Sequence, residues 1–153
     1  MTAMLDAPAR PDTQQRRDYL EELDRRVLFF DGAMGTQIHA AELRAEDYGG
    51  RDLEGCNENL VLLRPDGIAR LHEDYLAAGA DVIETDTFQG SRLKLNEWGL
   101  GDRTIEINRE AARIARRAAD RWSTPERPRF VAGSIGPTGM LPSADDPALS
   151  RIT

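Results

Sequence analysis

Cysteine is almost missing from this sequence, since Cys56 is the one cysteine among 153 residues. A single thiol excludes an internal disulfide and cannot by itself make a thiolate metal site, so we interpret it as a loop or partly buried thiol. Histidine is equally scarce: His39 and His72 lie in helical stretches without a partner at metal-ligand spacing. We interpret both histidines as surface or packing residues.

Excess positive charge and long apolar runs are lacking too. The 27 acidic residues outnumber the 20 Lys and Arg residues, and the net charge is −7. Nucleic acids and anionic membranes bind clustered positive charge, so neither is an expected partner. No stretch approaches the roughly 18 consecutive apolar residues of a membrane span, and the N-terminus has no apolar signal-peptide core. We therefore expect a cytoplasmic protein.

The length suits one domain with a substantial core. Residues 1–12 contain Pro8 and Pro11 and show no period, which predicts a disordered leader. Residues 13–153 are then the folded part. A short helix is predicted from residue 13, with an apolar stripe formed by Tyr19, Leu20, Leu23 and Val27.

Three strand-like runs, at residues 27–30, 81–88 and 129–137, each lead into polar or glycine-rich residues. Such runs predict strands buried on both faces of a parallel sheet, with their carboxyl ends directed at one place. Helical periodicity separates them. The pattern predicts a helical turn after Thr36, followed by an irregular loop up to Arg64. It then predicts three helices: from Pro65 to a left-handed cap at Gly79, within residues 90–100, and from about Arg103 to Trp122.

Four motifs stand at strand or helix boundaries: DGAMGTQI, CNENLVLLRPDGI, YLAAGADVIETDTF and FVAGSIGPTG. From Val27 onward, this sequence resembles the homocysteine S-methyltransferase family, in particular the N-terminal homocysteine-binding module of cobalamin-dependent methionine synthases. The resemblance implies a (β/α)₈ TIM barrel. Residues 13–153 would form about its first three βα units, with parallel strands, and the sequence would stop before the strands that carry the zinc ligands.

The resemblance assigns Asp31, Gly32 and Ala33 to substrate binding, with the acid helping to hold the amino-acid end of homocysteine and the adjoining N–H groups receiving its carboxylate. A free amino acid needs such an anion and such donors. From the residues alone, Asp31 is equally well interpreted as a turn cap that makes an Asx bond.

Glu84, Thr85, Asp86 and Ser134 are the remaining candidates for the substrate site. Glu84 and Asp86 are two residues apart, so on a strand both side chains leave the same face. Paired carboxylates in an apolar strand indicate a site, although an ion pair with an arginine explains Glu84 as well. Asp86 departs from the family pattern, where asparagine is common, and an ionised carboxylate there cannot donate a hydrogen bond.

The loop around Ser134 resembles the family's GSIGPT loop and includes Gly136 and Thr138. Its glycines, at 133, 136 and 139, fit neither GxGxxG nor GxxxxGK, which argues against a nucleotide site.

Activity depends, in the family, on zinc held by three cysteines that this sequence does not contain, and on methylcobalamin and methyltetrahydrofolate bound by other modules. The resemblance therefore predicts part of a methyltransferase that binds homocysteine, is inactive alone, and needs the remaining half of the barrel. The alternative is a stand-alone, non-catalytic α/β domain for amino-acid binding or protein interaction.

Overall fold

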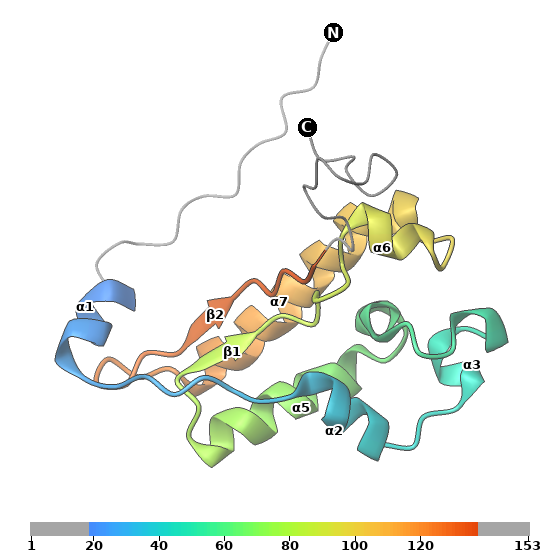
Figure 1. Cartoon of the computed structure of the whole chain (residues 1–153). Coiled ribbons are helices and arrows are strands. Elements are labelled where there is room, and N and C mark those ends of the chain that lie inside the picture. Colours follow the sequence, from blue (N-terminus) through green and yellow to red (C-terminus); the bar gives the residue numbers. More distant parts are fainter. Residues whose placement is uncertain (1–18, 138–153) are drawn as a thin grey trace, which may run out of the picture.

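Residues 19–137 are described by the computed structural model, and they form a small parallel sheet backed by helices (Figure 1). The predicted leader, the first residues of the predicted N-terminal helix, and the loop from Thr138 onward lie outside this range. The helices are α1 (Tyr19–Arg25), α2 (Met34–Ala40), α3 (Ala45–Tyr48), α4 (Leu60–Leu63), α5 (Pro65–Ala78), α6 (Arg92–Asn96) and α7 (Thr104–Trp122); the 3-10 turns are η1 (Arg51–Leu53), η2 (Asn57–Asn59) and η3 (Gly101–Arg103); the strands are β1 (Val82–Glu84) and β2 (Phe130–Ala132).

The sheet confirms the predicted parallel pairing. β1 and β2 run in the same direction, with Ile83 opposite Val131. The first predicted strand is reduced to one parallel bridge between Phe30 and Val82, supported by a 2.9 Å hydrogen bond from the N–H of Asp31 to the carbonyl of Val82. The spatial order is therefore residues 27–31, β1, then β2.

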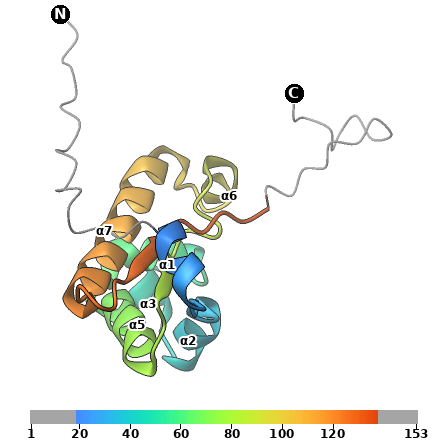
Figure 2. The same cartoon turned by 90° about the vertical axis from the view of Figure 1, so that its left-hand side faces the viewer.

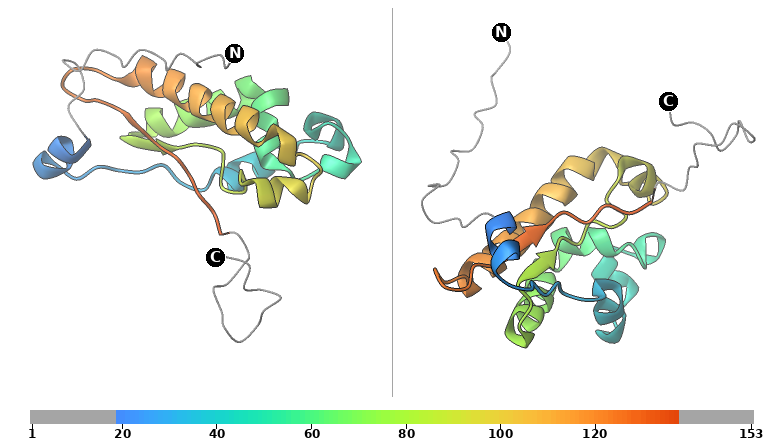
Figure 3. Two further views of the ribbon diagram at one scale, coloured as in Figure 1. Left: turned by 90° about the horizontal axis from the view of Figure 1, so that it is seen from above. Right: turned by 60° about the vertical axis from the view of Figure 1, so that its left-hand side comes forward.

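The two long helices follow the sequence prediction closely. α5 begins at Pro65, which has no N–H to lose in a first helical turn, and ends at Gly79, whose φ of 110° is the left-handed conformation that favours glycine. α7 covers residues 104–122. The apolar stripe predicted for this helix is buried at Ile107, Ala111, Ile114, Ala115 and Ala118, whereas its last residue, Trp122, is 38% exposed. Ile83 packs in one cluster with Leu76 of α5 and Ala115 of α7. The two helices lie on one face of the sheet (Figure 3).

Two predictions about the N-terminal region are wrong. In α1 the buried side chain is Glu22, at 2% exposure, whereas Leu20 and Leu23 of the predicted apolar stripe are exposed. Phe29 and Phe30 of the first strand were expected to be buried on both faces but are 64% and 48% exposed. The reason is packing: residues 27–31 lie at the edge of the sheet, with β1 on one side and no described strand on the other. α5 and α7 lie on one side of the sheet, while α1 lies near β2, where the ring of Tyr19 meets that of Phe130 edge-on at 5.5 Å (Figure 2).

The irregular loop predicted up to Arg64 is also more ordered than expected. It contains α3, two 3-10 turns and α4. These short pieces bury Tyr48, Leu60 and Val61 in the core beneath α5 and α7. Each piece is only three or four residues long, which is too short for a helical period to show in the sequence.

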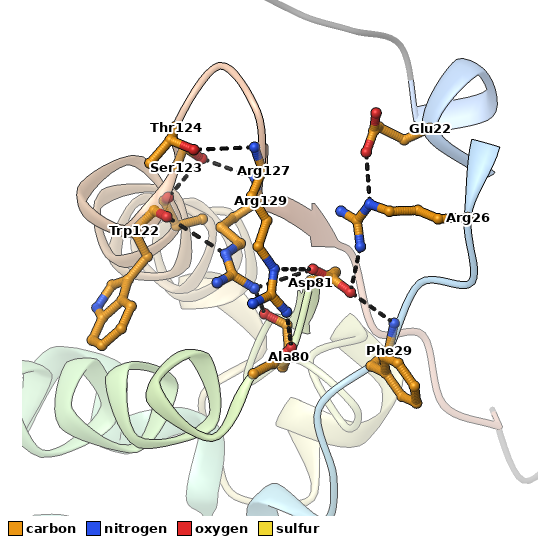
Figure 4. A network of polar contacts seen from close by, with 12 residues as sticks. Glu22, Arg26, Phe29, Ala80, Asp81, Trp122, Ser123, Thr124, Arg127 and Arg129 are labelled. Atoms are coloured by element: carbon orange, nitrogen blue, oxygen red, sulfur yellow. Dashed lines mark hydrogen bonds and ion pairs between the residues drawn. The ribbon is translucent and has the colours of Figure 1, made fainter. Parts of the chain in front are cut away.

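A charge network fixes the amino ends of the strands (Figure 4). The fully buried carboxylate of Asp81 lies 2.9 Å from Nη1 of Arg26, 3.0 Å from Nε of Arg127 and 3.1 Å from Nη1 of Arg129. It also accepts a 3.2 Å hydrogen bond from the N–H of Phe29. Burial alone raises the pKa of Asp81, but the hydrogen bonds from Arg26, Phe29 and Arg127 outweigh it and leave that pKa below its usual value.

The same network reaches α1. Arg26 Nε donates a 2.8 Å hydrogen bond to the carboxylate of Glu22, which explains why this acid is buried in place of the predicted apolar stripe. One residue, Asp81, thus ties α1, the first extended segment and the start of β2 to β1. No helix within residues 19–137 is long and apolar enough to cross a membrane.

Candidate functional site

Side chains from three chain segments meet at the carboxyl ends of the strands. The N–H of Glu84 donates a 3.0 Å hydrogen bond to Oδ2 of Asp31, and Oγ of Ser134 donates to Oε2 of Glu84 at 3.0 Å. Parallel strands place their carboxyl ends at the same sheet edge, so residues 53 and 50 positions apart come together. The structure therefore unites three of the predicted site residues.

Two threonine hydroxyls fasten the loop after β2 to the end of β1. The N–H of Ser134 donates to Oγ1 of Thr85 at 3.1 Å, and Oγ1 of Thr87 donates to the carbonyl of Ser134 at 2.8 Å. The two hydroxyls lie 2.7 Å apart. Thr85 is thus buried in a chain of hydrogen bonds that positions Ser134, and Thr87 belongs to the same chain.

The Asp31 turn combines an acid with free backbone donors. Within the described range, the N–H groups of Gly32 and Ala33 have no hydrogen-bond partner. A side chain at position 32 would approach Tyr75, because a Cβ there would lie 3.2 Å from its hydroxyl. Burial raises the pKa of Asp31 to about 6; the hydrogen bond from Glu84 N–H opposes this shift, and the nearby Glu84 charge adds to it. The turn offers an anion beside two donors, which suits the ends of an amino acid.

Asp86 does not share the surroundings of Glu84, contrary to the prediction that both leave one face. β1 ends at Glu84 and a tight turn follows, so strand alternation stops before Asp86. Glu84 is exposed, whereas Asp86 is 5% exposed. Burial, reinforced by the charge of Glu58, raises the pKa of Asp86 to about 7.

Glu58 is the residue that sequence reasoning missed. It is 5% exposed, and its Oε1 accepts a 2.8 Å hydrogen bond from the N–H of Gln89 in the turn after β1. The only signal was an acid between the asparagines of CNENLV, a motif that otherwise leads into an apolar run.

Residues 19–137 do not fit a zinc ion. They contain no group of three or more His, Cys, Asp and Glu side chains able to hold a metal. Cys56 is buried, and burial raises the pKa of its thiol to about 11, which disfavours the thiolate that binds zinc. His39 is exposed and His72 is fully buried, so the prediction of surface and packing histidines is confirmed.

A described groove lies elsewhere. It has a volume of about 600 Å³, runs between α2 and α5, and is lined mainly by apolar residues such as Ile38, Leu60 and Ile68. The cluster around Asp31 is instead an open surface at the strand ends.

Comparison with known proteins decides the family. The family model described as homocysteine S-methyltransferase matches residues 28–153. The chain belongs to the homocysteine S-methyltransferase family. Methionine synthase from Mycobacterium tuberculosis is 44% identical over 126 residues, which are 82% of this chain, and methionine synthase from Mycobacterium leprae is 44% identical over 130 residues, or 85%. The chain spans only 10% and 11% of these relatives.

Solved structures of this methyltransferase family agree. Two structures of the homocysteine methyltransferase MmuM from Escherichia coli each match 76% of the chain. The metallated form has a TM-score of 0.61 and 26% sequence identity, and the oxidized form has a TM-score of 0.62 and 27% sequence identity. The match extends over 40% of the MmuM chain. The family predicted from the four motifs is thereby confirmed.

Proposed function

We propose that the chain is the N-terminal part of a homocysteine S-methyltransferase module of the methionine synthase type, and that it holds the amino-acid end of homocysteine while the sulfur is methylated to give methionine. The observation that carries this proposal is the meeting of Asp31, Glu84 and Ser134 at the strand ends. Family membership supports it.

The roles follow from charge and donor direction. The carboxylates of Asp31 and Glu84 meet the substrate ammonium, and the unpaired N–H groups of Gly32 and Ala33 receive its carboxylate. Thr85 and Ser134 fix the loop that closes this end of the site. Asp86 is buried in the turn that follows β1 and acts on the site indirectly.

The architecture we propose is the first three βα units of a (β/α)₈ barrel. The single bridge at Phe30, the exposed phenylalanines and the 40% coverage of MmuM support it. In this proposal the partner is the remaining part of the barrel, which continues the sheet beyond its two edges at residues 27–31 and β2.

Cofactors belong to that remaining part and to further modules. Zinc, when bound there, activates the homocysteine sulfur, and methylcobalamin and methyltetrahydrofolate bind modules that this chain does not contain. The described residues orient the substrate, and we expect the chain alone to be inactive.

The test is Asp31→Ala in a module reconstituted with the complementary part of the barrel. Loss of a charge-assisted contact costs about 1.5–3 kcal/mol, so homocysteine affinity should fall on the order of tenfold to a hundredfold, with zinc content unchanged. Asp74→Ala, an exposed acid on α5, is the matched control. Equal affinity in Asp31→Ala and the parent, by isothermal titration calorimetry, would return Asp31 to the role of a turn cap.

A further inference from the structure

Two carboxyl groups are enclosed by the turn of residues 85–90. Asp86, near the start of this turn, and Glu58, on η2, are each 5% exposed. Glu58 is attached to the turn directly, because its Oε1 accepts from the N–H of Gln89 at 2.8 Å. The turn is closed by a 2.9 Å hydrogen bond from the N–H of Gly90 to the carbonyl of Thr87.

No positive charge balances this pair within residues 19–137. Neither carboxyl group lies within ion-pair distance of a described arginine, lysine or histidine. Oδ2 of Asp86 is fully buried and has no described hydrogen-bond partner. The other titratable groups that face Asp86 are the Cys56 thiol, which precedes η2, and the Tyr48 hydroxyl of α3, and neither carries positive charge.

Two neighbouring buried carboxyl groups without a cation cannot both be ionised at low cost, whereas one proton leaves the pair with a single charge. The Glu58 carboxyl group accepts a hydrogen bond from the N–H of Gln89, whereas Oδ2 of Asp86 accepts none from the described residues. We propose that Asp86 is the neutral carboxylic acid of this pair, and that its proton keeps the 85–90 turn closed and thereby positions Ser134.

The connection to the site is short. Thr85 and Thr87 belong to the same turn, and their hydroxyls hold the N–H and the carbonyl of Ser134. Ionisation of Asp86 places a second negative charge beside Glu58, which repels the turn from η2 and loosens both contacts. The raised pKa of Asp86, about 7, places this change near neutral pH. Asp86 is therefore a positioning residue, and this role stands whether or not homocysteine is the ligand.

The experiment is a pH titration of the 153-residue chain followed by NMR. Carboxyl-¹³C aspartate reports each acid, Asp86→Asn identifies the Asp86 resonance by its loss, and the ¹⁵N amide of Ser134 reports the site. We expect Asp86 to titrate near pH 7, far from its ordinary value of 3.8, and the Ser134 amide to move with the same midpoint. Asp74→Asn, which removes an exposed carboxyl group of α5, should change neither curve.

Two variants separate the proposal from a merely structural effect. Asp86→Asn keeps the shape and a donor, so the Ser134 amide should lose its step near pH 7 and keep only the smaller step near pH 6 that belongs to Asp31. Glu58→Gln removes the neighbouring charge, so the midpoint of Asp86 should fall, although burial still holds it above 3.8. An Asp86 resonance that titrates near 4, or a Ser134 amide that keeps its step near pH 7 in Asp86→Asn, would overturn the proposal.

Discussion

Removal of the Asp81 carboxylate is the severest single test of how this fold is held together. Asp81→Ala leaves three arginines without their shared partner, but the three differ in their access to water. The side chain of Arg129 is 6% exposed, whereas those of Arg26 and Arg127 are 30% and 46% exposed.

The expected loss follows from those exposures. A buried charge left without its partner costs about 3–5 kcal/mol, and this applies to Arg129. Water replaces the lost carboxylate at the two more exposed arginines, so each adds only about 0–1 kcal/mol. Because a domain has roughly 5–15 kcal/mol of stability in all, Asp81→Ala should unfold a large fraction of the chain or come close to it.

Urea unfolding followed by far-UV circular dichroism measures this loss as a lower midpoint. Asp81→Asn still accepts hydrogen bonds but has no charge, so it should lose less stability than Asp81→Ala. Glu73→Ala is the control, because it breaks the exposed Arg121–Glu73 pair on the helices and should cost no more than about 1 kcal/mol. A loss for Asp81→Ala as small as that of the control would refute the reasoning about the buried network.

Further predictions concern pH, packing and metal. The pKa of Asp86 is raised from 3.8 to about 7, so its contribution to stability is lost as pH rises between these values. Asp86→Asn does not lose it, and toward pH 7 its free energy of urea unfolding should exceed that of the parent by up to about 4 kcal/mol. Burial lowers the pKa of His72 from 6.5 to about 4, so the parent loses stability as pH falls between these values. The free energy of unfolding of His72→Gln should therefore rise relative to the parent over the same pH range. Cys56 should react with a thiol reagent only after unfolding, because its side chain is buried. Gly136→Ala should cost about 1–3 kcal/mol in the same unfolding assay, since a Cβ there would overlap the carbonyl oxygen of Phe88. Metal analysis of the purified chain should find no stoichiometric zinc, and one tightly held zinc per chain would contradict our assignment of the ligands to the remaining barrel.

The sequence was sufficient for the features that depend on local rules. Pro65 and Gly79 mark the two ends of α5 because of their own backbone preferences. The apolar stripe of α7 has a clear 3.6-residue period. The meeting of Asp31, Glu84 and Ser134 was also predictable, because it needs only that parallel strands end at one edge.

Features that depend on which partner is present could not be predicted in this way. The Leu20 and Leu23 stripe has the right spacing for burial, but Glu22 is the buried residue, and its carboxylate accepts a hydrogen bond from Arg26. Asp86 is buried because β1 ends two residues earlier, and strand periodicity gives no sign of that end. The contact from Glu58 to Gln89 joins residues 31 positions apart, and no repeat in the sequence connects them.

The short strand β1 has its anchoring charge and its ligand-facing groups at opposite ends. Asp81 precedes the strand and Glu84 ends it, so the side chains that secure the fold are separate from those that would select a ligand. Evolutionary change at one end need not disturb the other. A library randomised at positions 84 and 134 should therefore retain more folded members than one randomised at 81 and 129, which makes this strand a suitable starting point for altered amino-acid specificity.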